Sequence, residues 1–301
     1  MRHAGVIPAA NFPIRTGKAV NLPMKTVCQV CMHHCSLSPG QTGLCGARKN
    51  ENERIVCANY GRITSIALDP IEKKPLRKFH PGSLILSVGS YGCNLRCPFC
   101  QNHEISMAEE TQADTVFLSP GQLADTALEW KTRKGGGNIG VAFTYNEPLI
   151  GWEYVLDTAR LVREYGMATV LVTNGTASPE ILETLLPWID AMNIDLKGFR
   201  EAWYRKLGGD LETVKSFITK AVRDCHVELT TLIVPGENDS PEEMAEEARW
   251  IASLGREIPL HITRFFPRYH MADRNPTDIG HLYRLAETAG NYLSNVYVGN
   301  V

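Results

Sequence analysis

Six short aliphatic runs, each followed by a segment of helical character, constrain the fold of this chain more than any other feature. Runs of this length that are rich in β-branched and aliphatic residues are typical of strands buried on both faces. Strands that alternate with helices form a parallel sheet with right-handed crossovers. We therefore predict an α/β fold, a partial (β/α)6 barrel of the TIM type over residues 84–301. The runs lie at 84–88, 139–144, 168–173, 191–196, 227–234 and 260–265, with a seventh short strand predicted at 296–298.

Three of the intervening helices have recognisable first residues. Ser119-Pro120, Ser178-Pro179 and Ser240-Pro241 each place a serine at the N-cap and a proline at the first helical position. Both are favoured there, because serine can accept a hydrogen bond from a free backbone N–H and proline has no N–H to satisfy. Helices are therefore predicted to begin directly after these serines.

Residues 1–83 follow a different pattern and are predicted to form a separate N-terminal unit. Breakers are frequent in residues 1–27, which we expect to be an irregular arm, and four cysteines gather in residues 28–45. Residues 54–68 alternate loosely around an Asn-Tyr-Gly sequence, which is typical of a β-hairpin. Three prolines in residues 69–83 predict a loop. The chain is thus divided into a cysteine-rich unit with a β-hairpin and a barrel.

Composition excludes several classes of protein. The formal net charge of −2 gives no field that would attract nucleic acid, and there is no basic stripe. No apolar run reaches the roughly 20 residues that a membrane helix needs, and the first residues contain no apolar core of a secretory signal. Seven of the nine cysteines lie in two tight groups, unlike the dispersed cysteines of secreted domains. We expect a cytoplasmic protein whose thiols bind metal.

Cys93, Cys97 and Cys100 form a C-x3-C-x2-C sequence directly after the first predicted barrel strand. Thiolates are the usual ligands of iron–sulfur clusters, and a cubane normally takes four of them. Three ligands leave one iron with an open position, where a cofactor or substrate can bind. A zinc site completed by His103 and a redox-active dithiol are the alternatives.

Polar or glycine-containing sequences follow all six predicted barrel strands. Barrel enzymes build their active sites at the carboxyl ends of the strands. Each sequence alone is also ordinary turn chemistry, but six of them at one end of a barrel favour a functional site. They are the cysteine motif, Thr144–Pro148, Thr173–Gly175, Asp195–Lys197, Pro235–Asp239 and Arg264–Pro267.

The cysteine motif resembles the radical S-adenosylmethionine (SAM) signature C-x3-C-x-φ-C, in which Phe99 takes the aromatic place φ. The resemblance implies a [4Fe–4S] cluster on Cys93, Cys97 and Cys100 whose open iron binds the amino and carboxylate groups of SAM. It also implies reductive cleavage of SAM to a 5′-deoxyadenosyl radical, which abstracts a hydrogen atom from the substrate.

Within this superfamily the chain is most similar to the radical SAM enzymes of the AmmeMemoRadiSam system, which are pyruvate formate-lyase activating enzyme-like. The similarity implies an oxidoreductase whose substrate is either a protein glycine, as for glycyl-radical enzyme activases, or a molecule delivered by a partner. It also implies an electron donor such as flavodoxin or ferredoxin, and the group's name links it to two partner protein types. The matching sequence runs from Cys28 to Asn300 and includes Asp69–Leu76, Gly92–Asn102, Tyr145–Pro148, Asn193–Lys197 and Val298–Asn300.

The resemblance also assigns residues that bind SAM. Asn146, Glu147 and Pro148 stand where the superfamily has Gly-Gly-Glu-Pro at the SAM amino group, although both glycines are replaced. Asp195 and Lys197 match an Asp-x-Lys pair at the ribose or carboxylate side of SAM, and a surface ion pair is the alternative. Lysine suits a carboxylate as a point charge. Further SAM contacts are expected at Phe99, Thr173, Asn174 and Val234, the last beside the adenine.

Two positions depart from the pattern of the activating enzymes. Val172 stands where some of them have an aspartate that helps to bind a monovalent cation. His261 lies earlier on its strand than their histidine, and Phe266 stands near the expected position. Arg264 is therefore the candidate SAM contact on this strand, and His261 is expected to be a structural histidine. No catalytic residue beyond the cluster ligands is assigned.

The N-terminal cysteine group predicts a second metal. Its spacing is C-x2-C-x3-C-x9-C, through Cys28, Cys31, Cys35 and Cys45. Four thiolates complete a closed zinc site or ligate an auxiliary iron–sulfur cluster, and spacing does not decide between them. Uncoordinated thiols are a third option. We favour a structural metal, zinc ahead of iron–sulfur, because the segment has few apolar residues with which to fold alone.

The competing interpretation of the whole chain is a non-catalytic iron–sulfur or zinc module for electron transfer or binding. Such a module would need only the cysteines, as ligands of its metal. It would not require the motifs at the other strand ends, so their presence favours the enzyme.

Overall fold

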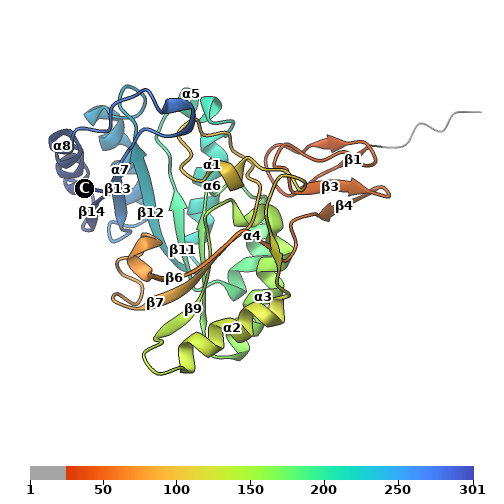
Figure 1. The fold of residues 1–301 in the computed structure, drawn as a ribbon. Coiled ribbons are helices and arrows are strands. Elements are labelled where there is room, and N and C mark those ends of the chain that lie inside the picture. Colours follow the sequence, from red (N-terminus) through yellow and green to blue (C-terminus); the bar gives the residue numbers. More distant parts are fainter. Residues whose placement is uncertain (1–24) are drawn as a thin grey trace, which may run out of the picture.

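The computed structural model describes residues 25–301, so most of the predicted irregular arm lies outside the described residues. The described chain begins with a small cysteine-rich region that projects from one side of a larger α/β body (Figure 1). Two short antiparallel strand pairs make up this region. They are β1 (Thr26–Val27) with β2 (Ser36–Leu37), and β3 (Arg48–Glu51) with β4 (Arg54–Cys57).

The main sheet has eight strands in the order β14–β13–β12–β11–β10–β9–β7–β6. Neighbours from β7 to β14 run parallel, and only β6 is antiparallel to its neighbour. The seven parallel strands match the predicted runs to within one residue, which confirms the predicted parallel α/β sheet. The strands are β6 (Ser65–Pro70), β7 (Leu84–Gly89), β9 (Asn138–Phe143), β10 (Ala168–Thr173), β11 (Ala191–Asp195), β12 (His226–Ile233), β13 (Leu260–Arg264) and β14 (Val296–Gly299).

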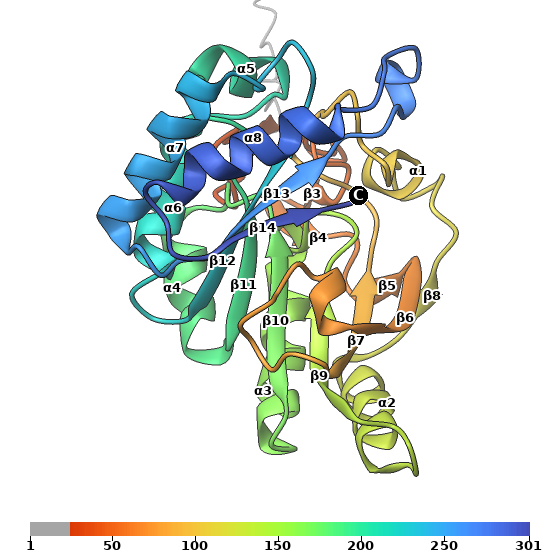
Figure 2. The same cartoon turned by 90° about the vertical axis from the view of Figure 1, so that its left-hand side faces the viewer.

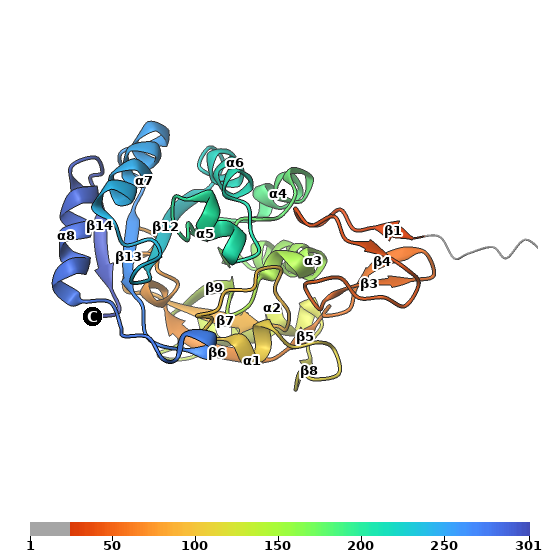
Figure 3. The ribbon, with the colours of Figure 1, turned by 90° about the horizontal axis from the view of Figure 1, so that it is seen from above.

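The sheet curves without closing. β6 and β14 each have a neighbour on one side only, so the barrel is open between these two edges (Figure 3). The helices lie along the outer face of the sheet (Figure 2). They are α2 (Pro120–Thr132), α3 (Trp152–Glu164), α4 (Pro179–Leu185), α6 (Leu211–Ala221), α7 (Pro241–Leu254) and α8 (Ile279–Gly290). Shorter elements are α1 (His103–Ser106), α5 (Glu201–Lys206), η1 (Ile71–Lys73), η2 (Pro148–Gly151), η3 (Leu186–Trp188), η4 (Tyr269–Met271), β5 (Arg62–Ile63) and β8 (Val116–Phe117).

Helix starts follow the predicted serine-proline pairs. Ser119 accepts a hydrogen bond from the Gln122 N–H in a capping box, and Ser240 accepts one from the Glu243 N–H. The third helix also begins directly after its serine, Ser178, although this side chain makes no capping bond. Within residues 25–301, no helix combines the length and the apolar character that crossing a membrane requires.

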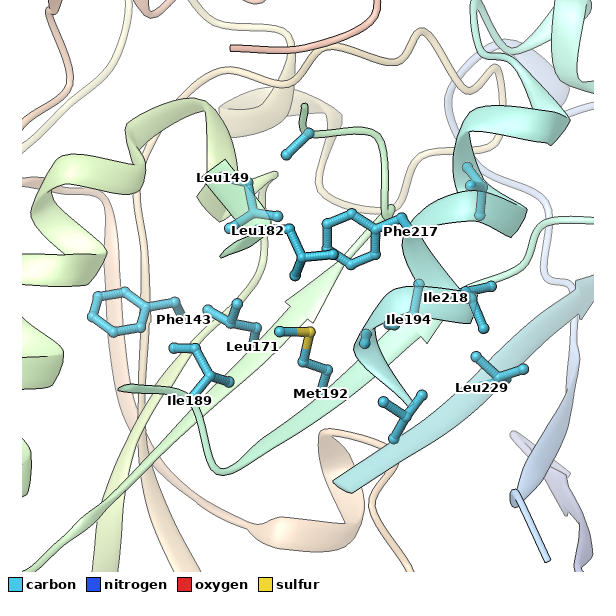
Figure 4. Close-up of a cluster of buried hydrophobic side chains, with 14 of the residues drawn as sticks. Phe143, Leu149, Leu171, Leu182, Ile189, Met192, Ile194, Phe217, Ile218 and Leu229 are labelled. Carbon is cyan, nitrogen blue, oxygen red and sulfur yellow. The ribbon is translucent and has the colours of Figure 1, made fainter. Parts of the chain in front are cut away.

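The main core lies between the sheet and its helices. Figure 4 shows Leu171 and Met192 of adjacent strands packed against Leu182 and Phe217 of the covering helices. Side chains on a strand alternate between the two faces, so the neighbouring Val170 and Ala191 belong to a separate cluster inside the curve of the sheet. The helix-facing cluster is the larger of the two and supplies most of the buried apolar surface.

The connection between β6 and β7 fills part of the inner face. Its side chains Ile71 and Leu76 are completely buried there. The buried carboxylate of Glu228 on β12 accepts hydrogen bonds from the backbone N–H groups of Arg77 (2.9 Å) and Lys78 (2.7 Å). The predicted loop is therefore fixed against the inner face of the sheet. It holds the residues that precede Leu76 beside the cavity described below.

A β-hairpin precedes the barrel, but at other residues than predicted. β3 and β4 form it around Asn52 and Glu53, which both have positive φ angles, as a two-residue turn of type I′ requires. The Asn-Tyr-Gly sequence instead lies in a turn between β4 and β5, and β5 pairs with β8. The hairpin expected over residues 54–68 is therefore wrong, because its two halves pair with other strands.

Candidate active site

The cysteines of the C-x3-C-x2-C motif lie on the loop between β7 and α1. Gly92 in this loop adopts φ +86°, and a Cβ atom there would lie 2.4 Å from the carbonyl oxygen of Cys45. The Cys93 N–H donates to that carbonyl at 3.1 Å, and the Arg96 N–H donates to the carbonyl of Leu207 at 2.8 Å. The N-terminal region and the end of α5 therefore fix the path of the loop from two sides.

The three cysteines line one cavity of about 460 Å³, and no other cysteine of the described residues lines it. Among residues 25–301, no three His, Cys, Asp or Glu side chains are gathered closely enough to hold a single metal ion. A cubane does not need such convergence, because each thiolate binds a different iron. Three soft donors with an open cavity in place of a fourth fit a [4Fe–4S] cluster.

Burial controls the ionisation of these thiols. It raises the pKa of Cys97 to about 11, against the opposing charge of Lys197, and it raises the pKa of Cys93 as well. Because metal binds the thiolate, loading of a cluster has to displace protons from both groups.

An apolar shell encloses the cysteine loop. The Phe99 ring stacks on Trp203 of α5, with ring centroids 5.9 Å apart. The sequence predicted Phe99 but not Trp203. The one hint for Trp203 in the sequence is that it is a large apolar residue among charged ones in a short helix. The other buried members of this shell are Leu95, Leu207, Val234, Phe265 and Met271.

The cavity brings together five of the six predicted strand-end motifs, whereas no residue of the sixth, Pro235–Asp239, lines it. Pro148 and Val234 do not reach its wall: Pro148 begins η2, and Val234 is buried in the apolar shell. The predicted residues that do line the cavity, besides the cysteines, are Phe99, Asn146, Glu147, Thr173, Asn174, Asp195, Lys197 and Arg264.

Glu147 ties the ends of β9 and β10 together. Its carboxylate accepts hydrogen bonds from the backbone N–H of Leu149 (3.0 Å), the Thr173 hydroxyl (2.7 Å) and the backbone N–H of Asn174 (2.7 Å). Burial raises its pKa to about 7, although these three bonds oppose the shift. The carboxylate is thus occupied by protein donors, which makes it a positioning group.

Asn174 extends this network to the cysteine loop. Its amide nitrogen donates to Asn94 Oδ1 at 2.9 Å and lies 3.8 Å from Cys93 Sγ. Its amide oxygen accepts from the backbone N–H (3.2 Å) and hydroxyl (2.6 Å) of Thr176. The Asn94 amide nitrogen in turn donates to the Thr176 hydroxyl at 2.7 Å. Sequence reasoning missed Asn94 and Thr176, which look like ordinary loop residues.

Asp195 and Lys197 form an ion pair in the cavity wall. Lys197 Nζ lies 2.8 Å from Asp195 Oδ2, and the lysine side chain is 15% exposed. Burial disfavours the ammonium, but Asp195 and Cys97 together raise the pKa of Lys197, so the side chain carries its charge. The backbone N–H of Lys197 donates to the Tyr204 hydroxyl at 3.0 Å. The pair therefore lies inside the cavity and not on the outer surface.

Tyr145 and Asn146 are the residues expected to replace the two glycines of the radical SAM pattern. Tyr145 adopts φ +72°, a conformation that glycine takes without strain. Asn146 donates from its amide to the carbonyl of Gly92 at 3.0 Å and accepts from the Ser90 N–H at 3.0 Å. The side chain of Asn146 thus supports the first residues of the cysteine loop.

The N-terminal cysteines lie close to this loop. Cys28 and Cys35 face each other across the β1–β2 pair, with a hydrogen bond from the Cys28 N–H to the Cys35 carbonyl at 2.9 Å. Burial raises the pKa of the Cys31 thiol to about 11. No three metal-binding side chains of the described region surround one point, so the geometry lends no support to the predicted zinc ion.

Comparisons with known proteins agree with this arrangement. The family model of the radical SAM superfamily matches residues 87–248. The uncharacterized protein MJ0808 of Methanocaldococcus jannaschii is 36% identical over 280 residues, which cover 92% of this chain and 82% of that protein. The pyruvate formate-lyase-activating enzyme of Clostridium pasteurianum is 28% identical over 168 residues, covering 54% and 67% of the two chains.

Solved structures share the fold. The Streptococcus suis protein SuiB bound to S-adenosylmethionine superposes with a TM-score of 0.55 at 15% identity, over 72% of this chain and 51% of SuiB. This chain thus matches about half of SuiB. The family model covers more than half of the chain, and its residues contain both the cysteine loop and the Glu147 network. The chain belongs to the radical SAM superfamily and is similar to the pyruvate formate-lyase activating enzymes within it.

Proposed function

We propose that the chain is a radical SAM oxidoreductase whose [4Fe–4S] cluster is bound by Cys93, Cys97 and Cys100. One observation carries the proposal: these thiols line a single cavity with four other strand-end motifs, and no other cysteine of the described residues lines it. When bound, the cluster and SAM supply reductive cleavage of SAM and a radical that abstracts hydrogen.

The chain's own residues would hold SAM against this loop. Lys197 offers a charged ammonium to the SAM carboxylate, and Asp195 keeps that ammonium in place. Asn146 and Asn174 line the same cavity after β9 and β10, with amide groups that hold the cysteine loop. Further proposed contacts are Phe99, Glu147, Thr173 and Arg264 in the wall, with Pro148 and Val234 behind it.

The proposed substrate is a protein glycine or a molecule brought by a partner protein. The activase-like assignment is supported by the similarity to the enzyme of Clostridium pasteurianum. A reduced flavodoxin or ferredoxin would supply the electron, and partner proteins of the AmmeMemoRadiSam system are candidate partners. These roles follow from resemblance, and reconstitution with the purified candidates tests them.

A second metal on Cys28, Cys31, Cys35 and Cys45 remains a proposal that rests on the soft donor set alone. Elemental analysis of the purified protein tests it. One zinc per chain, or iron clearly above the four of a single cubane, supports a second site. About four iron and no zinc would refute it.

Anaerobic reconstitution tests the enzyme itself. The protein is loaded with iron and sulfide and is then given SAM and dithionite, and 5′-deoxyadenosine is measured. We expect Cys97→Ser to lose both the visible absorption of the cluster and the product. Cys225→Ser is the matched control, because Cys225 lies outside the cavity. A full cluster with intact SAM in the unmodified protein would favour the non-catalytic module instead.

A further inference from the structure

The charges that line the active-site cavity do not balance. The cavity has two acidic side chains: Asp195 pairs with Lys197, and Glu147 accepts three hydrogen bonds from uncharged protein groups. Apart from the cysteines and the uncharged Tyr145, the remaining ionisable lining residues are cationic, and they are Lys73, Lys74, Arg264 and Arg268.

The two arginines have no acidic partner among the described residues. Arg264 Nε donates to the carbonyl of Thr277 at 2.8 Å, and its guanidinium lies over the Phe266 ring. Arg268 follows β13 and is exposed at the cavity mouth. If Arg264 contacts SAM, Arg268 is still left without a counter-charge.

The two lysines share one carboxylate. Lys74 is buried, with 3% of its side chain exposed, and its Nζ lies 2.9 Å from Asp69 Oδ2. Lys73 Nζ lies 3.6 Å from the other oxygen of Asp69, and the Tyr145 hydroxyl donates to Oδ2 at 2.9 Å. Two ammonium groups and a phenol thus share one carboxylate as their partner, so the group formed by Lys73, Lys74 and Asp69 keeps a net positive charge.

The two lysines lie where the barrel is open. Lys73 and Lys74 follow the edge strand β6, and Asn300, which also lines the cavity, follows the edge strand β14. The Glu228 anchor holds the connection that carries both lysines in place. A cation held in a partly closed cavity recognises carboxylate or phosphate groups strongly, because charge-assisted hydrogen bonds are stronger there than in open water.

We propose that the substrate presents a carboxylate or phosphate group inside this cavity, where Arg268 and the Lys73–Lys74 pair are the cations that would recognise it. This inference rests on the proposed function, because it names the substrate class of the same cavity. A free anionic metabolite and an acidic segment of a protein carry the same recognised group.

The test measures anion binding to the reconstituted enzyme with SAM bound, under anaerobic conditions by calorimetry. Inorganic pyrophosphate represents a free anion, and a capped hexaglutamate peptide represents an acidic segment. We expect the unmodified enzyme to bind at least one probe and Arg268→Gln and Lys73→Gln each to weaken that binding about fivefold, as for one partly exposed ion pair. Lys78→Gln is the charge-matched control, since its side chain is exposed and lies outside the cavity.

Binding of pyrophosphate alone would identify a small anion as the source, and binding of the peptide an acidic segment. The inference is overturned if neither probe binds, if Arg268→Gln and Lys73→Gln bind as tightly as the unmodified enzyme, or if Lys78→Gln weakens binding equally. Failure of the proposed function has a separate signature, because the unmodified enzyme would then yield no 5′-deoxyadenosine with SAM and dithionite.

Discussion

Replacement of Asn174 by alanine removes the side chain that joins β10 to the cysteine loop. Asn94 Oδ1 then loses its donor, and the Thr176 N–H loses its acceptor. Both residues are buried, with Asn94 1% exposed and Thr176 completely covered. The backbone N–H of Asn174 still donates to Glu147, so only the loop side of the network is lost.

The magnitude is worked from these two groups alone, because the Thr176 hydroxyl, which also loses Asn174 as its acceptor, still accepts a hydrogen bond from the Asn94 amide. A buried polar group without a partner costs about 1–3 kcal/mol, so Asn174→Ala is expected to lower the free energy of unfolding by about 2–6 kcal/mol. Urea unfolding of the cluster-free protein, followed by tryptophan fluorescence, measures this difference. The loop should also load less iron, because Cys93 directly precedes the freed Asn94.

Asn275→Ala is the matched control, since Asn275 is exposed and its stability change should stay within about 0.5 kcal/mol. A loss of less than about 1 kcal/mol in Asn174→Ala, with full iron loading, would refute the claim that this network holds the cysteine loop.

Two further predictions concern burial and backbone shape. Burial raises the pKa of Glu247 from 4.5 to about 8. Between pH 4.5 and 8 the carboxyl group is therefore protonated in the folded protein and ionised in the unfolded chain. The free energy of unfolding consequently falls as the pH rises through this range. Glu247→Gln should remove about 4 kcal/mol of this pH-dependent loss of stability. Urea unfolding at pH 5, 7 and 9 measures the loss in both proteins. An equal dependence of stability on pH in the variant would contradict the raised pKa of Glu247. Gly92→Ala should cost more stability and more bound iron than Gly82→Ala, because both glycines have positive φ but only Gly92 would place its Cβ against Cys45. If thermal unfolding shows equal losses of stability in the two variants, the positive φ angle alone explains them and the contact with Cys45 does not contribute.

The parallel sheet could be predicted from the sequence because its strands are buried on both faces. Such strands are unbroken aliphatic runs, and Ala168–Thr173 is predicted to the residue. The gathering of Glu147, Asn174 and Lys197 at one cavity also follows, since parallel strands end at the same edge of a sheet. Their pairwise bonds do not follow, because turn sequences specify where a chain bends and not which partner a side chain finds.

Two other features of the fold could not be predicted from the hydrophobic pattern of the sequence. Glu228 interrupts an aliphatic strand, and a buried carboxylate requires donors, yet the Arg77 and Lys78 N–H groups that satisfy it are about 150 positions away in the sequence. The turn at Asn52 and Glu53 was missed because glutamate rarely adopts a positive φ angle. Long-range pairing decided the first case, and local backbone conformation decided the second.

The contact between the Cys45 carbonyl and the Cys93 N–H couples the two cysteine regions of the chain. The path of the cysteine loop depends on residues beside Gly92 that belong to the N-terminal region. Damage to that region should therefore be felt at Cys93, although no N-terminal thiol lines the cavity.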